Sequence, residues 1–332
     1  MISTHHLEEI SSGCREQVSL YIRWNSVRLV VHLHKSESPP GTALPPIENS
    51  FIERYNVACD AEDGDEADTL SNEILDAIVE AGRPIFDQIA SPPTLTSTNL
   101  HTLLFPDEFA FCFRTLDGKA ELIRSDSDGF GHPFQLNVDQ DFNLPRFSTK
   151  DIQVLENILY NGYIARVAVD GKEMCSKAGD NKGPEAAQRE LECLWKITTS
   201  PYTTTIRVPK LLGLIEVSAE KRAVGFVADF IPVSATWELS TLGSIEAVSE
   251  VAKDRRKKWA SQVQETVHLL HQIGVVWGDG KASNVLIHRD TDDAWIIDFG
   301  GGWTDGWVTP ELSGTVEGDD MAVEKIFEFL EV

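Results

Sequence analysis

Cysteine is scarce in this chain of 332 residues: there are five, they are widely separated, and no two form a CxxC pair. This spacing excludes the usual cysteine-based zinc sites and a disulfide framework. No apolar run approaches the roughly 18 residues of a membrane helix, and the first residues, MISTHHLEEISSGCREQ, lack the basic and apolar regions of a signal peptide. We therefore expect a protein of an intracellular, reducing compartment, cytoplasmic or nuclear, that does not bind membranes.

Basic residues are also few: 29 Lys and Arg stand against 53 Asp and Glu, which gives a net charge of −24. A field of this sign repels phosphate backbones and anionic lipids, and it argues against general binding to nucleic acid. It remains compatible with ATP, because local lysines and Mg²⁺ can neutralise a few phosphates. Hydrophobic residues make up 42% and charged residues 25%, as in ordinary globular proteins, so most of the chain should fold.

Residues 1–147 are predicted to form an N-terminal extension of mixed α/β structure. Apolar residues alternate along two stretches that each contain a turn signal, so we expect β-hairpins over residues 18–34 and 109–124. Ile74, Leu75, Ile78 and Val79 share one helical face, which predicts a helix between the hairpins. No catalytic motif is present in this part of the chain.

Three other features of the extension are interpreted conservatively. The Pro- and Gly-rich residues 36–46 are expected to be a loop, and so is the acidic run 60–68, which lacks the spacing of a calcium-binding loop. The pairs His5-His6 and His32/His34 are candidate metal ligands, but a tail and the face of a strand explain them more simply.

The most informative stretch is residues 275–302, VVWGDGKASNVLI followed by AWIIDFGGG. Phosphoryl transfer needs a carboxylate that orients the acceptor hydroxyl, oxygen ligands for Mg²⁺, and a cation near the moving phosphate. Asp279 is the candidate for the first role and Lys281 for the last. Asn284 and Asp298, at either end of a predicted hairpin, are the candidate Mg²⁺ ligands.

With the motifs DxKxxN and DFG in this order, residues from about 150 onward resemble the protein-kinase-like fold, in the branch of divergent kinases common in filamentous fungi. The resemblance implies an α+β, two-lobed fold. Residues 148–232 would form an N-lobe with an antiparallel sheet of five strands and the helix that kinases call αC, and residues 233–332 a truncated, mostly helical C-lobe. It also implies ATP and Mg²⁺ as cofactors.

The same resemblance assigns residues upstream. Lys177, at the end of a predicted strand, aligns with the lysine that binds the α- and β-phosphates, and Glu190 in AAQRELECL aligns with its αC partner. Glu192 competes for the second role, but Glu190 lies on the side of the helix that should face inward.

The adenine site would involve backbone groups near Asp229 and Ile231, in the segment GFVADFIP, with Val167 and Ile287 as apolar lids. The glycine-rich loop should lie at residues 156–167, where Gly162 is the only glycine. The three-glycine pattern that lets backbone amides close over phosphates is therefore missing.

Several positions depart from the family pattern. Trp277-Gly278 replaces the usual His-Arg, so no arginine is present there to bind a phosphorylated activation loop. The Gly278-Asp279 pair is similar to small-molecule kinases of the aminoglycoside phosphotransferase type. Thr309-Pro310-Glu311 is either an APE-like motif or a simple turn. Asp319 or Asp320 resembles the aspartate that braces the catalytic loop, or else caps a helix.

These residues favour an ATP- and Mg²⁺-dependent phosphotransferase that transfers the γ-phosphate to a hydroxyl, either Ser/Thr of a protein or a small molecule. The alternative is a pseudokinase, a nucleotide-binding or scaffolding module without turnover, which the poor glycine loop and the short C-lobe motivate. The sequence identifies neither the acceptor nor an oligomeric state.

Overall fold

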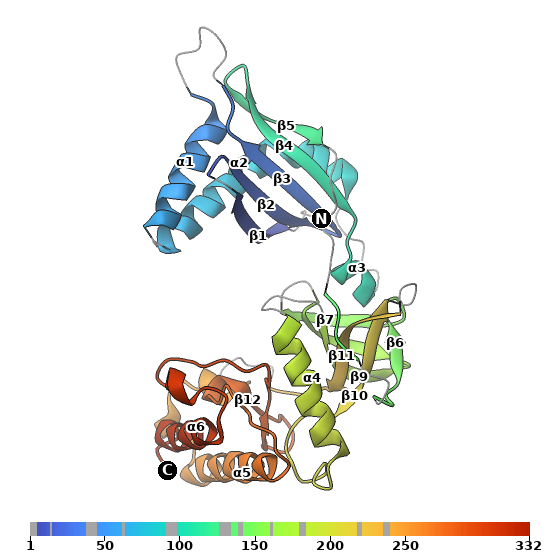
Figure 1. Cartoon of the computed structure of the whole chain (residues 1–332), viewed down its shortest axis with the longest axis vertical. Helices are drawn as coiled ribbons and strands as arrows, with labels where there is room; N and C mark the ends of the chain where they lie inside the picture. The colour runs from blue at the N-terminus through green and yellow to red at the C-terminus, as the bar shows by residue number, and fades with distance from the viewer. Residues whose placement is uncertain are drawn as a thin grey trace. The chain divides into compact units, whose positions relative to one another are not determined.

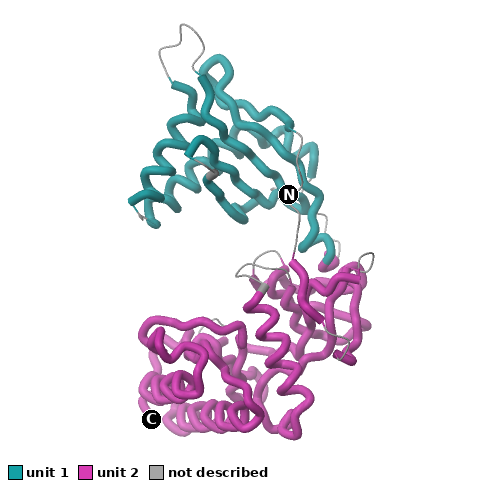
Figure 2. Tube along the Cα trace, viewed as in Figure 1, with its two compact units in different colours: residues 1–97, 101–132 teal, residues 98–100, 133–332 magenta. Residues whose placement is uncertain are grey.

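The computed structural model of the chain describes residues 5–13, 15–37, 45–61, 64–90, 98–125, 134–138, 142–159, 162–178, 184–217, 221–234 and 240–332. The chain folds as two compact units (Figure 2). Unit 1 comprises residues 1–97 and 101–132, and unit 2 comprises residues 98–100 and 133–332. The boundary expected at residue 147 from the sequence therefore falls inside unit 2.

Unit 1 is a five-stranded sheet with the strand order β1-β2-β3-β4-β5 (Figure 1). The strands are β1 (His5–Gly13), β2 (Gln17–Trp24), β3 (Val27–His34), β4 (Glu108–Leu116) and β5 (Lys119–Ser125). All neighbours are antiparallel except β3 and β4, which run parallel. Parallel neighbours need a long crossover connection, and this one contains the helices α1 (Ile47–Asp60), α2 (Gly64–Ile89) and α3 (Leu100–Leu104).

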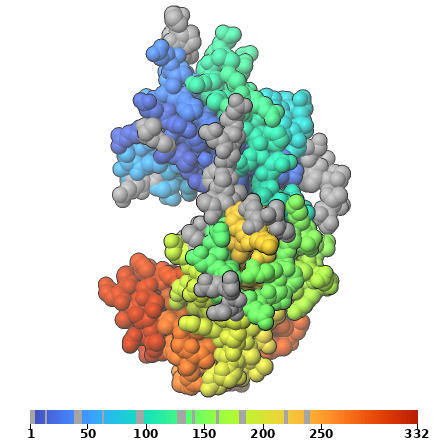
Figure 3. Space-filling view, turned by 45° about the vertical axis from the view of Figure 1, so that its right-hand side comes forward, coloured from blue at the N-terminus to red at the C-terminus, as the bar shows by residue number. Residues whose placement is uncertain are grey.

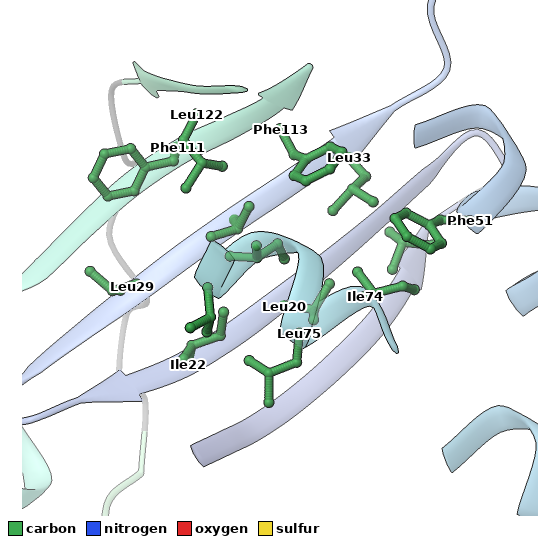
Figure 4. Packing of buried hydrophobic residues seen from close by; sticks show 14 of the residues in the cluster. Leu20, Ile22, Leu29, Leu33, Phe51, Ile74, Leu75, Phe111, Phe113 and Leu122 are labelled. Carbon is green, nitrogen blue, oxygen red and sulfur yellow. The ribbon is translucent and has the colours of Figure 1, made fainter. Parts of the chain in front are cut away.

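The core of unit 1 lies between one face of the sheet and the helices α1 and α2 (Figure 4). The alternating residues of β2 are fully buried, as the sequence predicts for the first hairpin, and so is Ile74 of α2. The second hairpin, β4 with β5, turns at Asp117-Gly118, where both residues have positive φ. The residues of the core that Figure 4 labels are Leu20, Ile22, Leu29, Leu33, Phe51, Ile74, Leu75, Phe111, Phe113 and Leu122.

Two features of unit 1 differ from the prediction. Helix α1 was not predicted from the sequence, and it buries Phe51, Ile52 and Tyr55 against the sheet. The expected loop over 60–68 is wrong for its second half, because Gly64–Asp68 begin helix α2. Asp65 and Glu66 in the first turn of α2 interact favourably with the positive end of the helix dipole.

Unit 2 begins with a six-stranded sheet in the order β6-β10-β11-β9-β8-β7. Its strands are β6 (Arg146–Ser148), β7 (Gln153–Leu159), β8 (Ile164–Val169), β9 (Lys172–Ala178), β10 (Leu211–Val217) and β11 (Arg222–Asp229). Helix α4 (Pro184–Thr199) lies between β9 and β10 in the chain and packs beside the sheet (Figure 1). The sequence predicted five antiparallel strands, and the sixth is the short β6, which pairs in parallel with β10.

Segments from earlier in the chain lie along both edges of this sheet. At one edge β6 pairs with β10. At the other, the amide N–H of Leu100 donates to the carbonyl of Ile152 (2.9 Å) and that of Val154 to the carbonyl of Thr98 (2.8 Å). These bonds explain why residues 98–100 belong to unit 2 although the chain on both sides of them belongs to unit 1.

The C-terminal part of unit 2 lies directly against α4 (Figure 3), where Arg189 Nη2 donates to the carbonyl of Val276 (2.9 Å). It contains the helices α5 (Lys253–Gln272) and α6 (Val316–Phe329) and the hairpin β12 (Val285–Ile287) with β13 (Ala294–Ile296). Short 3-10 helices are η2 (Leu242–Ser244), η3 (Val248–Glu250), η4 (Ala282–Asn284) and η5 (Pro310–Leu312). As expected, α5 buries one apolar stripe, and the chain turns after it at Gly274, which has a φ of +68°.

In the described part of the chain, none of the helices combines the length and the apolar character that crossing a bilayer requires. The four described cysteines, Cys59, Cys112, Cys175 and Cys193, are free thiols.

We predict that Glu48 stabilises unit 1 in a pH-dependent way. Its carboxylate is 1% exposed and accepts hydrogen bonds from Ser36 Oγ (2.7 Å) and Thr115 Oγ1 (2.5 Å). Burial alone would raise its pKa, but the hydrogen bonds from Thr115 and Ser36 hold the pKa below the usual 4.5. Because the folded-state pKa is depressed, the stabilisation is present above about pH 4.5 and is lost as the pH falls through the folded-state value.

Glu48→Gln should therefore lower the unfolding free energy of unit 1 by about 1–3 kcal/mol at pH 7 and by clearly less at pH 3.5. Urea unfolding at both pH values, followed by hydrogen exchange of peptides from α1 and β4, measures this difference. Glu53→Gln, on the exposed side of the same helix, is the control. An equal loss at both pH values would contradict the prediction.

Candidate active site

The first polar cluster of unit 2 joins the sheet, helix α4 and the segment after β13. Lys177 Nζ of β9 forms a hydrogen-bonded ion pair with Glu190 Oε2 of α4 and lies 3.7 Å from Asp298 Oδ1. The ring of Tyr163 lies 5.7 Å from the same ammonium group. The side chains of Lys177 and Glu190 are only 13% and 9% exposed, so both charges are largely removed from water.

Burial and the neighbouring charges both shift the pKa values of Lys177 and Glu190. Burial raises the pKa of Glu190, and the nearby carboxylate of Asp298 raises it further, although Lys177 opposes the shift. Burial would lower the pKa of Lys177, but Glu190 and then Asp298 outweigh it and raise that pKa well above its usual value. Lys177 is thus a fixed cation between two carboxyl groups, so the cluster favours a further positive charge.

Asp298 has the backbone strain that often marks functional positions. Its φ is +65°, in the left-handed region that residues other than glycine rarely adopt. Its Oδ1 also accepts a hydrogen bond from the amide of Gly300 (3.3 Å). The carboxylate is 31% exposed and is accessible to a ligand.

The second polar cluster surrounds Asp279. Lys281 Nζ donates to Asp279 Oδ2 (2.7 Å) and to Thr304 Oγ1 (2.9 Å), and Thr304 Oγ1 donates to Asp279 Oδ1 (3.0 Å). Asn284 Nδ2 donates to the backbone carbonyl of Asp279 (2.9 Å). The carboxylate is therefore held at both oxygens, and the amide oxygen of Asn284 accepts no hydrogen bond from any residue that the structure describes.

Asp319 of α6 braces the backbone just before Asp279. Its two carboxylate oxygens accept hydrogen bonds from the amides of Trp277 and Gly278, each 2.8 Å, and from Nε2 of His271 (2.8 Å). The helix-cap interpretation of Asp319 is wrong, because Thr315 caps α6 by accepting from the amide of Gly318 (3.0 Å). The neighbouring Asp320 is exposed.

The other five residues predicted for the nucleotide site, Gly162, Val167, Asp229, Ile231 and Ile287, are not members of these clusters. Val167 of β8, Ile231 and Ile287 of β12 are buried, and the side chain of Asp229 accepts from the amide of Lys210 (3.2 Å). Gly162 has a φ of +92° and donates its amide to Asn157 Oδ1 (2.8 Å). Within the described residues, none of the five forms a hydrogen bond or ion pair with the two polar clusters.

Two side chains at the site were not predicted from the sequence. Thr304 connects Asp279 with Lys281, and Arg189 of α4 donates hydrogen bonds to backbone carbonyls near Asp279 and Asp298. Neither stands in a recognisable motif, so only the fold reveals them. Thr309 stands at the start of η5, and Pro310 and Glu311 are its first residues, with Glu311 exposed.

We predict that Asp319 is essential to the shape of the segment before Asp279. Asp319→Asn turns one oxygen into a donor that faces an amide N–H, which should lower the unfolding free energy of unit 2 by about 2–4 kcal/mol. Urea unfolding monitored by tryptophan fluorescence measures the loss. Asp320→Asn removes the same charge from the next residue and should change stability by less than about 0.5 kcal/mol; equal effects of the two substitutions would refute the assignment.

Comparison with known proteins agrees with this geometry. The family model of the protein kinase domain matches residues 167–303, an interval that contains Lys177, Glu190, Asp279, Lys281, Asn284 and Asp298. No curated protein matches the chain. Residues 167–303 therefore have a protein-kinase-like fold.

Proposed function

We propose that the protein is an ATP- and Mg²⁺-dependent phosphotransferase. The observation that carries the proposal is the pair of polar clusters, Lys177–Glu190–Asp298 and Asp279–Lys281–Asn284, inside one kinase-like unit. Each residue type suits a step of phosphoryl transfer, which depends on positioning and on electrostatic stabilisation. The acceptor would be a hydroxyl group, either Ser/Thr of a protein or a small molecule.

Lys177 would bind the α- and β-phosphates of ATP. Its pairing with Glu190 supports this role, because a buried lysine with a raised pKa stays charged and keeps one orientation. The backbone near Asp229 and Ile231 would hold adenine, with Val167 and Ile287 on its faces. Ile231 is buried, with 7% of its surface exposed, yet its amide donates no hydrogen bond to any described residue. This amide is therefore a suitable donor to a ring nitrogen.

Asn284 and Asp298 fit a Mg²⁺ site. Both offer oxygen atoms, which Mg²⁺ prefers, and the amide nitrogen of Asn284 already donates to the carbonyl of Asp279, which leaves its oxygen as the atom available to a metal. Mg²⁺, when bound, neutralises negative charge on the phosphates. Asp298 Oδ1 also lies 3.7 Å from Lys177 Nζ, so the candidate metal ligand and the candidate phosphate-binding lysine are neighbours.

Asp279 would orient the acceptor hydroxyl and take its proton. Hydrogen bonds from Lys281 and Thr304 hold its two carboxylate oxygens at 2.7 and 3.0 Å, so the side chain has little freedom to turn away. Lys281 is close enough to Asp279 to stabilise charge on the group being transferred. Between Asp298 and η5 there are only eleven residues, 299–309, which leaves a short segment for acceptor binding.

The second candidate is a pseudokinase that binds nucleotide without turnover. The observation that favours it is the loop around Gly162, where a single glycine stands in place of three. The two candidates share the nucleotide site and differ in the role of Asp279, so separate experiments on Asp298 and Asp279 distinguish them.

We predict that ATP stabilises unit 2 only together with Mg²⁺. A ligand that binds the folded state raises its stability with the logarithm of the ligand concentration. At 5 mM ATP the melting temperature of the wild type should rise by several degrees with Mg²⁺. Asp298→Ala should remove the shift and Asn284→Ala should reduce it, while Asp290→Ala, in the turn of the β12–β13 hairpin, should keep it. No shift in the wild type at this concentration would refute the nucleotide site.

We also predict that turnover depends on Asp279. Release of γ-phosphate from labelled ATP should fall about 100-fold or more in Asp279→Ala, while the Mg²⁺·ATP thermal shift stays close to that of the wild type. Asp290→Ala is again the control. A wild type that binds Mg²⁺·ATP but shows no turnover with water, protein mixtures or small hydroxyl compounds would favour the pseudokinase.

A further inference from the structure

Among the described residues of helix α4, only Arg189 forms side-chain hydrogen bonds with both the segment before Asp279 and the segment after Asp298. Its guanidinium donates from Nη2 to the carbonyl of Val276 (2.9 Å) and from Nη1 to the carbonyls of Trp277 (3.3 Å) and Phe299. A planar guanidinium with several fixed donors suits such a set of acceptors better than a lysine does.

The three carbonyls belong to residues that position the site. Val276 and Trp277 come shortly before Asp279, and Phe299 directly follows Asp298. The next residue of α4, Glu190, forms the ion pair with Lys177. Glu190 thus binds Lys177, and the preceding residue, Arg189, binds the segments that contain Asp279 and Asp298. Two consecutive residues of α4 therefore contact all three parts of the proposed site.

The backbone is shaped to accept this arginine. Gly278 has a φ of +90°, and a Cβ added there would lie 2.6 Å from Arg189 Nη2 and 3.1 Å from its Cζ. Gly301 has a φ of +82°, and a Cβ there would lie 3.4 Å from Arg189 Cδ. Any side chain at Gly278 would be strained and would also displace the guanidinium.

The segment before Asp279 is held from two sides. Asp319 of α6 binds the amides of Trp277 and Gly278, while Arg189 of α4 binds the carbonyls of Val276 and Trp277. Asp319 keeps the segment attached to the C-terminal helices, and its bonds do not involve α4. Arg189 makes the position of α4 depend on the positions of Asp279 and Asp298.

We propose that Arg189 is a positioning residue that holds α4 in the arrangement in which Lys177, Glu190 and Asp298 meet. The fold itself then assembles the site, without a phosphorylated residue in the segment after Asp298. The catalytic part of this inference rests on the proposed function, whereas the position of α4 can be measured without nucleotide.

Two variants and one matched control test the proposal. Arg189→Met keeps most of the volume and removes all donors, and Arg189→Lys retains one donor group. Lys196→Met removes a positive charge from the exposed side of the same helix. Hydrogen exchange of the amides of α4 and of residues 275–279 is measured without nucleotide, and binding of Mg²⁺·ATP and phosphate release are measured in parallel.

In Arg189→Met we expect exchange of the α4 amides to rise about tenfold, with the exchange of unit 1 unchanged, and the affinity for Mg²⁺·ATP to fall about tenfold. Arg189→Lys should recover part of both effects, and Lys196→Met should match the wild type. A purely structural role would lower the folded fraction but leave the affinity of the folded protein and the exchange pattern of α4 unchanged.

The contact with Gly278 provides an independent test. Gly278→Ala should weaken binding of Mg²⁺·ATP more strongly in the wild type than in Arg189→Met, because the steric conflict exists only when the arginine is present. Additive effects of the two substitutions would contradict the coupling.

The outcomes separate this inference from the proposed function. Unchanged α4 exchange in a folded Arg189→Met protein would overturn the positioning role, and if that variant does not fold, unchanged α4 exchange in Arg189→Lys would overturn it. If the wild type binds no nucleotide but Arg189→Met still loosens α4, the proposed function fails and the positioning of α4 stands.

Discussion

The ion pair between Lys177 and Glu190 is the constraint on which the arrangement of unit 2 depends. Both side chains are about nine-tenths buried, and a buried charge that loses its partner destabilises a protein strongly. Lys177 is fixed in the sheet by the pairing of β9 with its neighbours, so α4 must stay beside the sheet to supply Glu190. The same helix then brings Arg189 to the carbonyls of the C-terminal part.

The sequence predicts well those features that depend on local order. The hairpins of unit 1 follow from alternating apolar residues and Asp-Gly or Asn-Ser turns, and the residues of DxKxxN and DFG stand close together in the chain. It fails for features that depend on distant contacts. Helix α1 is stabilised by the packing of Phe51 and Tyr55 against the sheet, and β6 is a strand because it pairs with β10. In the sequence Arg189 looks like any surface arginine, and only the fold places it beside Gly278.

Burial also explains the surroundings of two sets of residues in unit 1, the candidate metal-binding histidines and the basic residues of the sheet. The described residues contain no group of three or more His, Cys, Asp or Glu side chains that could hold a metal ion, and His32 instead contacts Ser19 Oγ at 2.8 Å. Burial lowers the pKa of His32, so it is uncharged at neutral pH. On the same sheet, Glu8 accepts from Arg23 and Arg28 at 2.6 and 2.5 Å, so basic residues are used inside this acidic chain where they offset buried carboxylates.

The edge pairing of the unit 2 sheet has a consequence for any attempt to separate the units. Strand β6 covers the backbone groups of β10, and residues 98–100 cover those at the start of β7. A protein shortened to begin at residue 149 would lose both segments and present two bare strand edges, which recruit other chains and lead to aggregation. Because residues 98–100 lie between two parts of unit 1 in the chain, no single cut yields both units intact.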